Sequence, residues 1–177
     1  MVRIKHLLQI LLVLVSISFS QAVCADVSVT FYSHDFDDHF PHAFFVANGD
    51  LSNGVVIDDA FGFTAKKISP TILLGSVKGH VSRPSIKYIQ NSMMHFTVIL
   101  DDKQYKNLKL VVEKWERIPG KSYNLKKRNC VHFTADILKA LGLTINVNSK
   151  HFKKPKSFLR EVTALNSDLK LRSSENQ

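Results

Sequence analysis

The residue type best suited to nucleophilic chemistry in this chain is cysteine, and the sequence holds only Cys24 and Cys130. Cys130 follows Asn129 at the expected start of a helix, directly after three cationic residues, Lys126, Lys127 and Arg128. A thiol in the first turn of a helix is exposed to the partial positive charge of that helix end. Together with the cations, this predicts a thiol pKa below the ordinary value of about 8.5, as a nucleophile requires. The backbone N–H of Cys130 is expected to face a developing oxyanion.

A cysteine nucleophile needs a base, and His42 is the best-placed histidine. It opens the apolar run His42–Ala47, and a rigid strand holds an imidazole in fixed geometry better than a loop does. His132 lies two residues beyond Cys130, and side chains at that spacing on a helix point in different directions. The sequence therefore predicts a Cys130–His42 pair, with the sulfur about 4 Å from a ring nitrogen.

Other interpretations of these residues stay open. Cys130 is alternatively a buried structural thiol, and if Cys24 is retained in the mature chain the two cysteines can form a disulfide. The segment His34–His42 holds three histidines and three aspartates, a density that invites a metal interpretation. No second cluster of ligands is evident elsewhere, so the sequence predicts neither a metal site nor any other cofactor.

The elements that must position this chemistry follow from hydrophobic periodicity. Alternating or apolar runs predict strands at Val27–Tyr32, His42–Ala47, Val55–Ile57 and Phe96–Leu100. Residues 61–64 are expected to continue the third of these strands past a bend. The run Ile72–Val77 is ambiguous.

Three helices are predicted. The first is capped by Asp101 or Asp102, ends before Pro119-Gly120, and has an apolar face at Tyr105, Leu108, Val112 and Trp115. The second starts at Asn129 or Cys130 and stops at Gly142, with Phe133, Ile137 and Leu141 on its inner face. A short third helix is expected within Ser157–Leu165. The mixture predicts an α+β fold, a small and mostly antiparallel sheet packed against helices.

The N-terminus has the three-part pattern of a secretory signal peptide. Arg3 and Lys5 precede an apolar run over 7–19, and small-residue cleavage patterns end at Ala22 and Ala25. We therefore expect a signal peptide at 1–25, a hydrolase domain at 26–145, a basic extension at 146–177, and export to the periplasm or the exterior. Removing 1–25 removes two cations and no acids, so 24 − 2 = 22 Lys and Arg face 15 acids, a net charge of +7.

This positive charge predicts attraction to anionic envelope polymers or to a membrane surface. The basic stretch Lys150–Lys156 is the segment expected to contact such a partner. No nucleic-acid motif is present, so nucleic acid is not expected as a partner. The oligomeric state is not determined by the sequence.

Two motifs resemble those of the circularly permuted papain-like group, which includes permuted NlpC-type peptidases and lecithin:retinol acyltransferase-like proteins. Phe40–Phe45 resembles the histidine strand, Phe61–Thr64 resembles an aromatic-Gly-Phe segment, and Tyr123–Leu125 with Asn129–Phe133 resembles the cysteine motif. The resemblance covers roughly 27–143 and implies a permuted papain-like fold with histidine before cysteine. Pro41 departs from it, because glycine often precedes the histidine in that group.

The resemblance implies a third polar residue that orients the histidine, and Asp58 or Asp59 lies in the matching stretch. Strand alternation lets only one of the two face His42. The expected activity is hydrolysis of an amide bond, with cell-wall peptide as substrate. The alternatives are a lipid esterase or acyltransferase that uses the same thiol, and an envelope-binding domain without catalysis. A wide, polar cleft would favour a peptide substrate, and a narrow, apolar groove would favour a lipid substrate. A His42 ring far from Cys130 would favour a domain that binds without catalysis.

Overall fold

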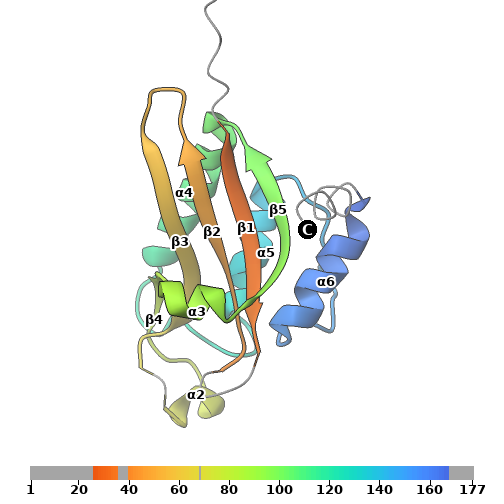
Figure 1. The fold of residues 1–177 in the computed structure, drawn as a ribbon. Helices are drawn as coiled ribbons and strands as arrows, with labels where there is room; N and C mark the ends of the chain where they lie inside the picture. The colour runs from red at the N-terminus through yellow and green to blue at the C-terminus, as the bar shows by residue number, and fades with distance from the viewer. Residues whose placement is uncertain (1–25, 36–39, 68, 168–177) are drawn as a thin grey trace, which may run out of the picture.

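The computed structural model describes residues 26–35, 40–67 and 69–167. Its centre is a five-stranded antiparallel sheet in the order β4-β3-β2-β1-β5, and Figure 1 shows its strands side by side. The strands are β1 (Val27–His34), β2 (His42–Asp50), β3 (Val56–Ala65), β4 (Gly79–Ser82) and β5 (Met93–Leu100). The predicted α+β class is confirmed.

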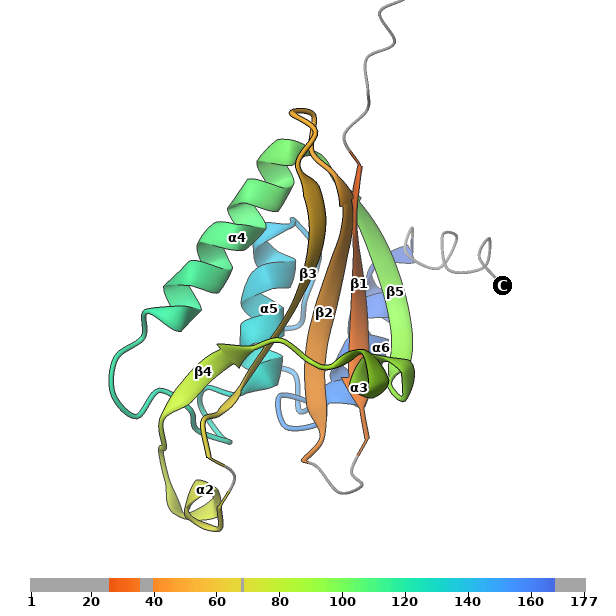
Figure 2. The ribbon, with the colours of Figure 1, turned by 60° about the vertical axis from the view of Figure 1, so that its left-hand side comes forward.

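Helices cover the two faces of the sheet unequally. Helices α4 (Asp102–Glu116), α5 (Cys130–Ala140) and α6 (Pro155–Leu165) pack on one face, whereas α3 (Ile86–Gln90) lies across the other (Figures 1 and 2). The short α2 (Thr71–Leu74) lies beyond one end of the sheet. We refer to these two faces of the sheet as the α5 face and the α3 face.

The longer predicted elements agree with the structure. Helix α4 is capped by Asp101, whose carboxylate accepts from the Gln104 N–H, and its four predicted apolar residues are buried. Strand β3 runs without interruption through the expected bend. The sequence did not predict β4 and α3, which are short, and the ambiguous run beginning at Ile72 contributes to α2.

Strand alternation along β2 sorts its side chains between the two faces. Phe45 packs against Phe133 of α5, with ring centroids 5.8 Å apart. Phe44, the preceding residue, packs against Tyr88 of α3 at 5.6 Å. This alternation sets the direction of every side chain near the start of the strand, including the predicted base.

Helix α6, within the segment expected to be a basic extension, belongs to the core. Phe158, Leu159 and Val162 of α6 are buried, and α6 packs against β1, β2, β5 and α5. The folded domain therefore continues to the end of α6 at Leu165 and does not end at the boundary expected at 145. The predicted signal peptide and Cys24 lie outside the described residues. Within the described part of the chain, no helix is long and apolar enough to cross a membrane.

Candidate functional site

Asn129 fixes the point at which α5 begins. Its side-chain oxygen accepts from the N–H groups of Val131 at 2.9 Å and His132 at 3.2 Å. Its amide nitrogen donates to the carbonyls of Leu125 at 2.9 Å and Phe152 at 2.8 Å. Four bonds from one buried side chain hold the preceding loop, the helix start and the segment before α6 together. Cys130 is thereby placed as the first residue of the helix.

The Cys130 thiol is buried, with 4% of the residue exposed, and it is free of any disulfide. Burial raises its pKa to about 11, even though the backbone N–H groups of Ala43, Val131 and Cys130 itself hydrogen bond to the sulfur and act in the opposite direction. The sequence predicted a lowered pKa, so this expectation is wrong for the described conformation. Desolvation favours the neutral thiol more strongly than the helix end favours the thiolate.

The three cations before Cys130 do not reverse this balance. Lys126, Lys127 and Arg128 are exposed, in a turn closed by paired backbone hydrogen bonds between Asn124 and Arg128 of 2.8 and 2.9 Å. Water and salt screen exposed charges, so their field at a buried sulfur is weak.

His42 directs its ring toward the α3 face. The ring lies 6.0 Å from Phe44 and 6.5 Å from Tyr88, centroid to centroid. It also covers Gly62, where an added Cβ would lie 2.3 Å from the His42 Nε2. The pKa of His42 is lowered to about 4, mainly by burial and to a smaller extent by the neighbouring His34. The imidazole is therefore neutral at physiological pH.

The two side chains of the predicted catalytic pair lie at the start of β2, but on opposite faces of that strand. The sulfur contacts the backbone of Ala43 on the α5 face, whereas the ring of the adjacent His42 packs among residues of the α3 face. Among the described residues, no hydrogen bond joins Cys130 to His42. The two groups are neighbours through the strand backbone but do not form a dyad in this conformation.

Neither predicted orienting carboxylate reaches His42. In the sheet, Asp59 pairs with Ala47 and Asp58 pairs with Asn48. These partners lie five and six residues beyond His42 in β2, which is roughly 17 to 20 Å at about 3.3 Å per residue. Asp58 is exposed and binds Arg83 at 2.9 Å.

Asp59 has its own partners on α4. It accepts from the Tyr105 hydroxyl and lies 3.0 Å from Lys109 Nζ. Burial raises the pKa of Asp59, but the hydrogen bonds from Tyr105 and Lys109, together with the positive charges of Lys109 and Arg83, outweigh burial and leave the pKa below its usual value. Asp59 therefore ties β3 to α4.

Two cavities flank the start of β2. A cavity of about 230 Å³ includes His42 and is otherwise lined mainly by apolar and hydroxyl side chains, among them Ala65, Ile72, Pro84 and Tyr88. A cavity of about 190 Å³ includes Cys130, with Leu125, Asn129, Val131, Lys153 and Pro155. Phe40, Pro41 and Tyr123 line both. The thiol and the imidazole thus open on adjoining, largely apolar spaces that share one wall.

Sequence reasoning missed several residues of this region. Tyr88 comes from a helix too short to show periodicity. Tyr123 belongs to the motif that resembles the cysteine segment, but nothing in the sequence indicated that it lines a cavity. Nor did any pattern predict that His95 would hydrogen bond to Ser33 at 2.8 Å. The described residues contain no cluster of three or more potential metal ligands, and 36–39 of the His34–His42 segment lie outside them.

Comparisons of this chain with protein-family models, with curated proteins and with solved structures found no match.

Proposed function

We propose that this protein is an exported cysteine hydrolase that cleaves an amide bond, with Cys130 as nucleophile and His42 as base and cell-wall peptide as substrate. One observation carries the proposal. The sulfur lies at the first residue of α5, within hydrogen-bond reach of the Ala43 N–H, directly after His42, and it opens on a cavity.

The reaction would proceed through an acyl-enzyme. His42 takes the thiol proton, the sulfur attacks the carbonyl carbon, and backbone N–H groups of the first turn stabilise the oxyanion. The His42 imidazolium then protonates the leaving amine. Water, deprotonated by His42, displaces the sulfur and releases the carboxylic acid.

This mechanism requires a change from the described conformation. A neutral thiol with a pKa of about 11 is a poor nucleophile, and the His42 ring must reach the α5 face to take its proton. The shared wall of Phe40, Pro41 and Tyr123 is where such a movement would occur. Substrate binding between the two cavities would supply the free energy for it.

Two observations favour other functions. The apolar lining of both cavities suits the alternative substrate class, a lipid ester or acyl group. The position of the His42 ring and the raised pKa of Cys130 suit a binding domain without turnover.

Turnover assays on matched variants separate these functions. We expect the mature chain to release amine from muramyl peptides, Cys130→Ser to lower kcat about 10³-fold or more, and His42→Ala to lower kcat/KM about 10²- to 10⁴-fold. His80→Gln, on β4, serves as the control and should retain activity. Hydrolysis of short acyl esters but not of peptides would identify the lipid-type substrate. Retained binding of an apolar fluorophore with no turnover would identify the binding domain, and turnover unaffected by Cys130→Ser would refute the mechanism.

A further inference from the structure

An apolar pair projects from one end of the molecule. Leu73 and Leu74 of α2 are 67% and 86% exposed, whereas Ile72 is 4% exposed and lines the His42 cavity. Successive residues of a helix point about 100° apart, so anchoring Ile72 in the core directs the next two side chains outward. Figure 2 shows α2 standing away from the sheet at the lower end of the molecule.

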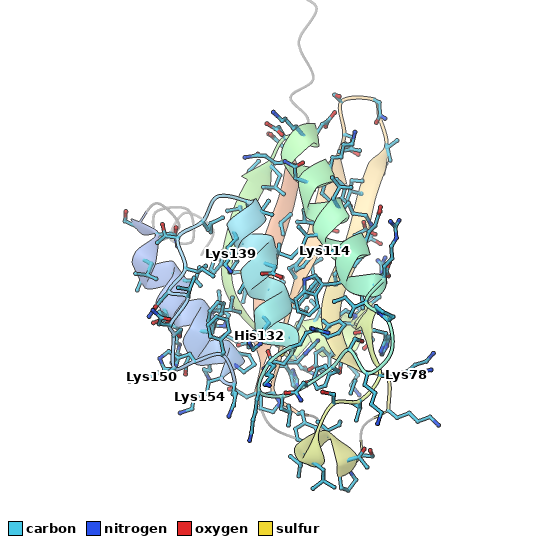
Figure 3. All side chains as sticks on the ribbon, turned by 180° about the vertical axis from the view of Figure 1, so that it is seen from behind. Lys78, Lys114, His132, Lys139, Lys150 and Lys154 are labelled. Atoms are coloured by element: carbon cyan, nitrogen blue, oxygen red, sulfur yellow. The ribbon has the colours of Figure 1, made fainter. Side chains whose placement is uncertain are left out.

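Exposed lysines lie on both sides of α2 along the chain. The segments on either side of α2 carry Lys66, Lys67 and Lys78. The Lys66 N–H donates to the Lys78 carbonyl at 2.8 Å, and this hydrogen bond joins the two ends of the segment that contains α2. Lys78 is labelled in Figure 3, in the lower half of the molecule. We call residues 66–78, without the undescribed 68, the α2 tip.

A second basic segment adjoins the α2 tip. The Asn124 side-chain amide donates to Ser76 Oγ at 3.0 Å, and its oxygen accepts from the Lys126 N–H at 2.9 Å. The turn that carries Lys126 and Lys127 is therefore tied to the tip.

No acidic residue dilutes these charges along either segment of the sequence. Between Asp59 and Asp101 the chain contains no aspartate or glutamate, and between Glu116 and Asp136 it again contains none. The cations of these two intervals are Lys66, Lys67, Lys78, Arg83, Lys87, Arg117, Lys121, Lys126, Lys127 and Arg128. Of these cations, Arg83 and Arg117 are paired with Asp58 and Glu113, and the lysines of the α2 tip supply the positive charge that an anionic surface would meet.

We propose that the α2 tip docks this protein on a lipid bilayer that carries anionic headgroups. Leu73 and Leu74 enter the boundary between headgroups and acyl chains, and the lysines of the tip contact lipid phosphates. A soluble polyanion would use the lysines but has no apolar phase to receive the leucines. Because Ile72 joins the tip to the wall of the His42 cavity, docking brings that cavity to the bilayer surface.

Vesicle binding tests this proposal without any turnover. The mature chain should bind vesicles of phosphatidylcholine mixed with phosphatidylglycerol more tightly than vesicles of phosphatidylcholine alone, and less tightly at high salt. Leu73→Ser/Leu74→Ser should weaken binding to the anionic vesicles about tenfold or more. Lys66→Gln/Lys67→Gln/Lys78→Gln should weaken it about a hundredfold.

Matched controls lie on α4. Leu110→Ser removes an exposed leucine and Lys103→Gln/Lys106→Gln removes exposed lysines, and both should bind as the unmodified chain does. Cys130→Ser should also bind normally, so failure of the hydrolase proposal is distinguishable from failure of this one. Thermal unfolding of each variant checks its fold. Equal binding by the Leu73→Ser/Leu74→Ser variant would overturn the proposal, and if polyphosphate also displaces that variant from vesicles, the surface is a polyanion site instead.

Discussion

At the scale of single residues, the direction of one side chain decides the chemistry. His42 and Ala43 are consecutive in β2, so alternation sends one toward α3 and the other toward α5. The Cys130 sulfur contacts the Ala43 backbone, and the imidazole one residue away stands on the other side of the strand. The proposed pair is therefore close along the chain but is separated by the strand backbone in the described conformation.

Gly62 provides a test of this placement. An alanine Cβ there would lie 2.3 Å from the His42 Nε2, so the ring must shift, and we expect Gly62→Ala to lower the free energy of unfolding by about 1–3 kcal/mol. The loss should shrink when His42→Ala is already present, because the smaller side chain leaves room. Chemical denaturation of both single variants and the double variant measures this coupling. Gly75→Ala, with no atom within 4 Å of the new Cβ, is the control. An equal loss in both backgrounds would mean that the ring does not cover Gly62.

At the scale of elements, the start of α5 depends on one buried cap. Asn129 satisfies two N–H groups of the helix and two carbonyls of other segments. An alanine at this position leaves buried donors and acceptors without partners, which costs more than the loss of an exposed cap.

We expect Asn129→Ala to lower the free energy of unfolding by about 2 kcal/mol or more. Freed from its cap, the first turn should open more often, so Cys130 should react faster with iodoacetamide at neutral pH. Ser85→Ala is the comparison, since Ser85 caps the short α3 at an exposed site. If the two substitutions cost the same, the four hydrogen bonds of Asn129 do not have the role assigned to them.

At the scale of the whole molecule, α6 closes the core over the sheet. Phe158 is fully buried, whereas Leu165 at the end of the same helix is exposed. We expect Phe158→Ala to lower the free energy of unfolding by about 3–5 kcal/mol and Leu165→Ala to change it little. Deletion of 146–177 should prevent folding, as judged by the loss of cooperative thermal unfolding. A truncated chain that unfolds cooperatively at an unchanged temperature would return this segment to the status of an extension.

Half-buried neutral histidines make the stability of the whole molecule sensitive to acid. The pKa of His42 and that of His95 are both lowered to about 4, from an unfolded value of about 6.5. Burial is the main cause for each, and for His95 the nearby Arg160 and Lys156 also lower the pKa, whereas Asp35 raises it. Between these values the unfolded chain binds more protons. Stability is therefore greatest above about pH 6.5 and falls as the pH drops toward 4, with at most about 3 kcal/mol from His42.

Denaturation at pH 7 and pH 5 measures this loss. His42→Phe and His95→Gln should each reduce the difference between the two pH values, although either can lower stability at pH 7. A pH dependence that stays the same in both variants would assign the acid sensitivity to other groups.

Elements with long periodic patterns could be predicted from the amino-acid sequence alone. The apolar face of α4, its cap at Asp101 or Asp102 and the start of α5 at Asn129 or Cys130 follow from local rules, because spacing and capping act within a few residues. The α+β class followed from the same patterns. Short elements such as α3 and β4 carry too few residues for a period to appear, and packing against distant segments decides them.

The arrangement of the candidate site depends on contacts between distant segments and could not be predicted from local patterns. Whether His42 faces Cys130 depends on which face of β2 packs against α5. Whether Asp58 or Asp59 reaches His42 depends on the register between β2 and β3. Both are set by contacts between segments far apart in the sequence. The pKa of Cys130 likewise depends on desolvation by segments far away in sequence, whereas the helix end and the cations visible in the sequence act locally. Local charge could be predicted from neighbours along the chain, and burial could not.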